Sequence, residues 1–246
     1  MNEFNQYEPA APQSGALAAA LGGRMAFVQK VYALFMLGIL TTIGAGAMLF
    51  MGPSETVSVG ERTIQVPLAL ASVANAYIAV IIGFFVTFFI ARAVWRVAGL
   101  NVVMMLVFCA VTGVMITPRV FIATIQDGAS TVAMAGAMTA ITFGALTVYA
   151  FVSRRNFSFL GAGLNMALWG LILGGLLNGF FFHSPVTHWL MSWFGLVIFG
   201  GYVLYDTSVI LRELDEEDYT GGALRLYLDA VNLFLTILSL LGGRRD

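Results

Sequence analysis

Seven apolar runs, separated by short polar breaks, constrain the fold of this chain more than any other feature of its sequence. They cover about residues 26–51, 68–91, 100–117, 130–152, 157–181, 188–211 and 222–241. A helix needs about 20 mostly apolar residues to cross a bilayer, and each run is close to that length. The breaks or their edges hold four prolines, as is typical of helix ends: Pro53, Pro67, Pro118 and Pro185. The pattern predicts an all-α membrane protein, a bundle of seven transmembrane helices over residues 24–243.

The composition supports the same class and excludes several others. Hydrophobic residues make up 59% of the chain and charged residues 10%, which is far from a soluble domain. A net charge of -1 without a basic cluster gives no indication of nucleic acid as a partner. The apolar composition makes the lipid bilayer the predicted environment. The single cysteine, Cys109, excludes an intramolecular disulfide framework and a multi-cysteine zinc site.

Residues 1–23 are polar, rich in Ala, Gly and Pro, and carry two acidic but no basic side chains. This composition predicts a disordered N-terminal tail. The segment lacks the basic start and directly following apolar core of a secretory signal, so we expect the first span to act as an uncleaved insertion signal.

The distribution of Lys and Arg predicts the orientation in the membrane. Basic residues gather at one side of the spans: Arg24, Lys30, Arg92, Arg96, Arg154 and Arg155. The loops of the other side hold only Arg62 and Arg119, with Arg244 and Arg245 at the chain end. The positive-inside rule therefore places the N-terminus in the cytoplasm and, with seven spans, the C-terminus outside.

Each of the last two spans contains one aspartate. Asp206 lies about five residues from the end of the sixth span, and Asp229 lies about seven residues into the seventh. With a rise of about 1.5 Å per residue, both carboxyl groups lie at a depth of roughly 8–10 Å on antiparallel neighbours. An ionised carboxylate in a membrane costs several kcal/mol, so such residues face partners and not lipid.

The two carboxyl groups have the chemistry of a proton switch. Two carboxylates within hydrogen-bond reach cannot both ionise cheaply, so the pair should share a proton and titrate as a unit. Other polar residues fall on the same helix faces: Tyr202, Asn232 and Thr236. We interpret Tyr202, Tyr205 and Tyr227 as packing and hydrogen-bond support, and Asn232 as a residue that orients Asp229. The alternative to a proton switch is a purely structural polar contact between the two aspartates.

No metal site is defined by the remaining candidates. His183 and His188 lie in a short outer loop and supply two ligands where zinc needs three or four, so a membrane-surface belt with Trp189 and Trp193 is the preferred interpretation. The turn between the last two spans has a cluster of acids without the spacing of an EF-hand: Glu213, Asp215, Glu216, Glu217 and Asp218. We interpret it as a solvated turn, with weak calcium binding by the cluster as the alternative. Weak calcium binding is the one metal role considered for Asp206 and Asp229.

The sequence does not predict an enzyme or a cofactor. It contains no nucleophile and base at a plausible spacing, no phosphate-binding glycine loop and no HExxH motif. Two aspartates are also the arrangement of an intramembrane aspartic protease. Tyr205 and Asp206 form the YD motif of that class, but its GxGD motif is missing around Asp229.

Two segments resemble the Bax inhibitor-1 family, also called the transmembrane Bax inhibitor motif family: GYVLYDTSVIL in the sixth span and LYLDAVNLFLTILSLLG in the seventh. RMAFVQKVYALFMLGILTTIGAGAMLF in the first span and LVFCAVTGVMIT in the third are similar to it more weakly, and the resemblance extends over about residues 24–243. It implies seven helices with the last one central, and a paired-aspartate pH sensor of calcium leak at Asp206 and Asp229. It also implies a second-helix arginine that latches Asp206, either Arg92 or Arg96, of which Arg92 lies closer to the span. The middle of the second span, AYIAVIIGFFVTFFI, lacks the acidic residue of some relatives.

The resemblance implies a bacterial inner-membrane protein that conducts calcium or another cation in a pH-sensitive leak. With the pair sharing a proton and latched to the arginine, the path is closed; ionisation of both carboxyl groups should separate the last two helices or offer a cation site. The alternative is a non-conducting regulator that binds a membrane-bound protease or another complex, a role in which the cytoplasmic tail would serve.

Overall fold

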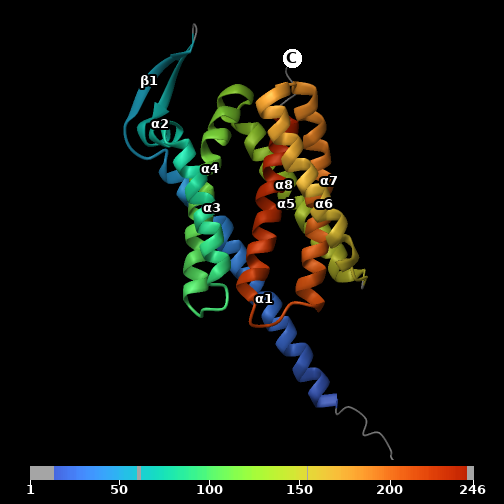
Figure 1. The fold of residues 1–246 in the computed structure, drawn as a ribbon. Coiled ribbons are helices and arrows are strands. Elements are labelled where there is room, and N and C mark those ends of the chain that lie inside the picture. The colour runs from blue at the N-terminus through green and yellow to red at the C-terminus, as the bar shows by residue number, and fades with distance from the viewer. Residues whose placement is uncertain (1–13, 60–61, 154, 243–246) are drawn as a thin grey trace, which may run out of the picture.

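The structure, a computed structural model, describes residues 14–59, 62–153 and 155–242 and is a bundle of long helices with one small β-hairpin (Figure 1). In chain order its elements are α1 (Ser14–Met48), β1 (Ser54–Val59), β2 (Arg62–Pro67), α2 (Leu68–Asn75), α3 (Tyr77–Ala93), α4 (Leu100–Asp127), α5 (Ala129–Val152), α6 (Gly161–Leu177), α7 (Pro185–Arg212) and α8 (Tyr219–Gly242). A 3-10 turn, Ser158–Leu160, precedes α6, and a π-helical turn, Asn178–Phe182, follows it.

The described helices confirm the all-α membrane fold. Six are long and apolar enough to cross a membrane, and α2 with α3 makes a seventh span if this bent pair crosses as one. The helices cover all seven predicted runs. The second run is not one straight helix, because its two parts meet at an angle of 79° around Ala76.

Pro118 was expected at a helix boundary, but it lies inside α4, which continues to Asp127. A proline removes one backbone hydrogen bond, and polar side chains nearby can compensate within a membrane helix. The hydroxyl of Thr117 donates to the carbonyl oxygen of Gly113 at 2.6 Å, one residue from the carbonyl that the proline leaves free. The third span is therefore longer than the apolar run 100–117.

The first helix also begins earlier than predicted. Residues 1–13 of the predicted tail lie outside the described residues, but α1 begins at Ser14 and so includes the rest of that segment. The sequence from Ala16 to Leu21 is ALAAAL, and Ala and Leu are the strongest helix formers. The predicted tail therefore overlaps α1 from Ser14 onward, and the disorder of the tail stays a prediction.

The hairpin of β1 and β2 was not predicted. The strands pair antiparallel, from Ser54 opposite Pro67 to Val59 opposite Arg62. Figure 1 shows the hairpin and α2 at the same end of the bundle as the C-terminal end of α8, with the α7–α8 turn at the opposite end. The β-branched residues in SETVSV and RTIQVP carry the strand signal.

The last helix occupies the centre of the bundle, as expected. Helix α8 packs against α1, α4, α5 and α7, and the side chains of Leu226, Tyr227 and Leu233 are fully buried. Helix α6, at the outside, has no buried residue. Large exposed apolar side chains on outer helices are what a lipid-facing surface requires.

Helices α1 and α4 approach most closely at Gly113. A Cβ atom on Gly113 would overlap the backbone carbonyl of Thr42, so only glycine fits there. Thr42 lies opposite Tyr227 of α8, and their hydroxyl oxygens are 2.6 Å apart in a buried hydrogen bond. This contact joins three helices in the middle of the bundle.

Candidate functional site

The two predicted aspartates lie side by side in the α7–α8 hairpin. Asp206 on α7 is 4% exposed and Asp229 on α8 is 5% exposed, although both lie in helices apolar enough to span a membrane. The turn between the helices covers residues 213–218, a little shorter than expected. The sequence therefore correctly located both carboxyl groups near one end of two antiparallel neighbours.

The carboxyl groups are close enough for a hydrogen bond when one of them carries a proton. Oδ2 of Asp229 is buried and finds no hydrogen-bond partner among the described residues. Removing a carboxylate from water is costly unless other groups bind it. The arrangement can thus hold one proton between two buried carboxyl groups.

Arg225 supplies the positive charge at the pair. Its Nη1 lies 3.0 Å from Oδ1 of Asp206 in a salt bridge, with the side chain of Arg225 35% exposed. Arg225 and Asp229 are four residues apart on α8 and so share a helix face. The guanidinium therefore reaches the buried pair from the hydrated end of the hairpin.

This partner differs from the predicted latch. Arg92 lies in the last turn of α3 and Arg96 in the connection to α4, and both are exposed. Their guanidinium carbons are 5.9 and 4.4 Å from the ring centre of Trp95. Neither forms a salt bridge with Asp206 in the described structure. The sequence missed Arg225 because its position next to the acidic turn is typical of a solvated charge; its spacing of four from Asp229 was the available signal.

Asp218, directly before α8, is buried, whereas the other acidic residues of the turn are exposed. Its Oδ1 accepts a hydrogen bond from the backbone amide of Gly221 at 3.0 Å, which caps the helix. Burial raises the pKa of Asp218 above its ordinary value, against the opposing effects of the Gly221 amide and of the charge on Arg225. Among the described residues, no group of three or more His, Cys, Asp or Glu side chains could hold a metal ion.

The predicted supporting tyrosines separate into two groups. Tyr202 lies one turn before Asp206, near enough to both aspartates for their charges to act on it. The ring of Tyr205 is 6.3 Å from that of Tyr202 and fills the space over Gly161 of α6. Tyr227 faces α1 and α4, where it bonds Thr42.

Asn232 does not orient Asp229 through a hydrogen bond in the described structure. It lines a cavity of about 320 Å³ between α6, α7 and α8. Thr236 and Ser239, further along the same helix, line the same cavity, as does Arg119 of α4. The polar side of α8 therefore continues from Asp229 toward the end of the bundle opposite the turn.

Arg24 is a second contact that sequence reasoning did not find. Its guanidinium donates to the carbonyl oxygens of Ile210, Leu211 and Leu214 at 2.6, 3.0 and 2.5 Å. These are carbonyls at the C-terminal end of α7, which a cation stabilises both by hydrogen bonds and through the helix dipole. Arg24 thereby holds the end of the helix that carries Asp206.

Comparisons with known proteins identify the family. The profile of the family described as "Inhibitor of apoptosis-promoting Bax1" matches residues 24–246. The chain is 34% identical over 229 residues to the Golgi anti-apoptotic protein of Vaccinia virus (strain Lister), an alignment that covers 93% of this chain and 90% of the viral protein. It is 31% identical over 219 residues to Bax inhibitor 1 of Schizosaccharomyces pombe, covering 89% of this chain and 77% of the yeast protein.

A bacterial relative aligns over an even larger share. The chain is 27% identical over 245 residues to the inner membrane protein YbhL of Escherichia coli (strain K12), which covers 95% of this chain and 98% of that protein. The family match covers most of the chain and includes the spans that carry both aspartates. The chain belongs to the Bax inhibitor-1 family of multi-pass membrane proteins.

Proposed function

We propose that this protein is a pH-sensitive cation leak, with calcium as the transported ion, and that the pair of Asp206 and Asp229 gates it. The observation that carries the proposal is a buried pair of carboxyl groups with one arginine in an otherwise apolar hairpin. Ionisable residues inside membrane spans mark ion or proton pathways.

The charges of the cluster define two states. With one proton shared, the pair carries one negative charge, which the guanidinium of Arg225 neutralises. Loss of that proton leaves one negative charge in excess inside the membrane-spanning bundle. The excess charge would repel the two carboxylates from each other and attract a cation, so this state corresponds to the open leak.

A polar route toward the pair supports the proposal. The cavity of about 320 Å³ reaches Asn232, which is three residues from Asp229 on α8. Three residues correspond to a rise of about 4.5 Å. A small displacement of α7 from α8 would therefore connect the cavity with the aspartates.

The orientation and the membrane are part of the proposal. Arg92 in the last turn of α3, Arg96 after it and Arg155 after α5 lie at the end of the bundle that holds the α7–α8 turn. The positive-inside rule then places this end and the N-terminus in the cytoplasm. The name of the E. coli relative favours the inner membrane.

Calcium flux into liposomes tests the proposal directly. The purified full chain should give a flux that changes between about pH 6 and pH 8. Asp206→Asn and Asp229→Asn should each abolish the change with pH, because the remaining carboxyl group has no partner with which to share a proton. Asp215→Asn, in the exposed turn, is the matched control and should behave like the parent.

If the flux of both Asp→Asn variants responded to pH as the flux of the parent does, the proposed gate would be refuted. No flux above empty liposomes at any pH would refute the leak itself. In that case the function to test is the non-conducting regulator, by identifying a membrane-bound protease or other complex that co-purifies with the chain.

A further inference from the structure

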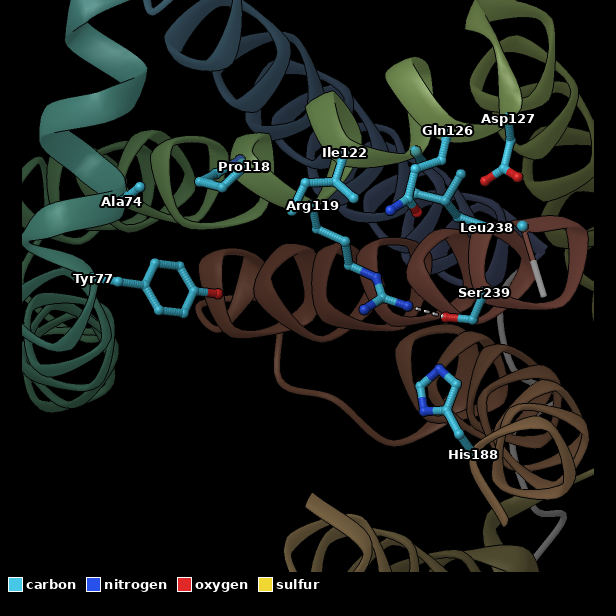
Figure 2. Close-up of a pocket in the computed structure, with 12 residues that line it drawn as sticks. Ala74, Tyr77, Pro118, Arg119, Ile122, Gln126, Asp127, His188, Leu238 and Ser239 are labelled. Atoms are coloured by element: carbon cyan, nitrogen blue, oxygen red, sulfur yellow. Dashed lines mark hydrogen bonds between the residues drawn. The ribbon is translucent and has the colours of Figure 1, made fainter. Parts of the chain in front are cut away.

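A cavity of about 530 Å³ lies at the end of the bundle opposite the α7–α8 turn (Figure 2). Its walls come from α2, α3, α4, α7 and α8. The smaller cavity that reaches Asn232 adjoins it, because Arg119, His188 and Ser239 line both. The proposed leak gives neither Arg119 nor His188 a task.

The guanidinium of Arg119 makes the centre of the larger cavity positive. Nη2 of Arg119 donates to the hydroxyl of Ser239 at 2.6 Å, and Arg119 forms no salt bridge with any described residue. A guanidinium has five N–H donors, so most of its hydrogen-bonding capacity is unused. Figure 2 shows His188 and the guanidinium on adjacent sides of the same space, and the charge of Arg119 acts on the His188 ring.

The carboxylate in this cavity is too distant to neutralise Arg119. Asp127 is eight residues further along α4, a rise of about 12 Å. Figure 2 shows it beyond Gln126 at the far side of the cavity. The site around Arg119 and His188 therefore lacks an anion that the protein itself could supply from the described residues.

The remaining walls are mostly apolar. They include Pro118, Ile122 and Leu238, and the ring of Tyr77 faces the cavity from α3. Trp189 and Trp193, with ring centres 6.0 Å apart on the same end of α7, are typical of the membrane–water interface. A cationic centre with apolar walls at this level fits an anionic group attached to an apolar body.

We propose that Arg119 and His188 form a binding site for a phosphate group, carried by a phospholipid headgroup or by a soluble phosphate ester. The planar fork of a guanidinium matches two phosphate oxygens, and an N–H of the His188 ring adds one further donor. The Ser239 hydroxyl, which already donates to the carbonyl oxygen of Leu235, holds the guanidinium in place. Acyl chains of a lipid would lie against the apolar walls. The site is independent of the aspartate pair and of any ion flux.

The test uses the full chain, purified and stripped of lipid in detergent. Native mass spectrometry measures the binding of three probes: short-chain phosphatidylglycerol, glycerol phosphate, and a diacylglycerol with the same chains but no phosphate. The variants are Arg119→Gln and His188→Gln, with Arg155→Gln at the opposite end of the bundle as the matched control. Thermal unfolding shows that each variant is folded before its binding is compared.

Arg119→Gln should weaken binding of the phosphate-bearing probe about tenfold to a hundredfold, His188→Gln less, and Arg155→Gln not at all. Tighter binding of phosphatidylglycerol than of glycerol phosphate identifies the ligand as a lipid, and equal binding identifies a soluble ester. Equal affinity of the parent and Arg119→Gln, or equal binding of phosphatidylglycerol and the diacylglycerol, would overturn the proposal.

Discussion

Arg24 offers the sharpest test of how this fold is held together. The guanidinium of Arg24, on α1, donates to three carbonyl oxygens at the end of α7, those of Ile210, Leu211 and Leu214. Ile210 and Leu211 lie in the last turn of α7 and Leu214 just beyond it, where carbonyls have no partner within the helix. Arg24→Ala should therefore leave them unsatisfied and loosen the end of the helix that carries Asp206.

The expected loss can be estimated from the contacts. A hydrogen bond to a charged group contributes roughly 1.5–3 kcal/mol, but three bonds from one half-buried guanidinium share a single side chain and water can replace part of each. A total of about 3 kcal/mol is a reasonable sum. In a chain of this size 1 kcal/mol corresponds to about 2–4 °C, so the Tm should fall by roughly 6–12 °C.

Thermal unfolding in detergent measures this shift, and hydrogen exchange locates it. Arg155→Ala, an exposed arginine at the same end of the bundle, is the control and should leave the Tm unchanged. Arg24→Lys keeps the charge but not the fork of donors and should fall in between. Amides of residues 207–214 should exchange faster in Arg24→Ala. A Tm equal to that of the control, with unchanged exchange, would refute the assigned role of Arg24.

Three further changes follow from the contacts described above. Because burial raises the pKa of Asp218, the stability that its protonated form contributes is lost, and the Tm falls, as the pH rises from about 3.8 through the raised value. Asp218→Asn, which can still cap α8, should flatten this fall in Tm. Equal slopes of Tm against pH in the parent and the variant would contradict the reasoning. Gly113→Val places side-chain atoms on the Thr42 carbonyl and should lower the Tm by more than 5 °C, about 2 kcal/mol or more, whereas Gly144→Val, with open space around it, should not. Arg225→Gln removes the cation bonded to Asp206 and should alter the pH profile of the leak, while Arg225→Lys retains most of it; identical profiles would exclude the ion pair from gating.

The sequence predicts those parts of this fold that depend on one chain segment at a time. Each span is set by its own apolar length, and the depth of Asp206 and Asp229 follows from counting residues to the turn. The position of Pro118 could not be obtained in this way. Its helix continues through the proline inside the bundle, where α1 and α3 both pack against α4, and such packing cannot be obtained from one segment alone.

The partners of charged side chains were the least predictable part of the site. The family resemblance pointed to an arginine of the second span, but the structure bonds Asp206 to Arg225 of α8. Several arginines lie at this end of the bundle, and only the rotation of α8 about its axis selects among them. The same applies to Arg24, since its acceptors are about 190 residues away in the sequence.

Together these contacts indicate where the proposed gate can open. Helix α1 is bonded to α7 through Arg24, and to α8 through the hydrogen bond between the hydroxyl groups of Thr42 and Tyr227. Separating α7 from α8 must therefore break the salt bridge of Arg225, which joins the two helices directly, and one of these contacts with α1. The Thr42–Tyr227 bond is fully buried, whereas Arg24 and Arg225 are partly exposed, so water can replace their bonds at lower cost. Opening should then start at the α7–α8 turn and hinge about Tyr227, and Arg24→Ala should raise the leak as well as lower the Tm.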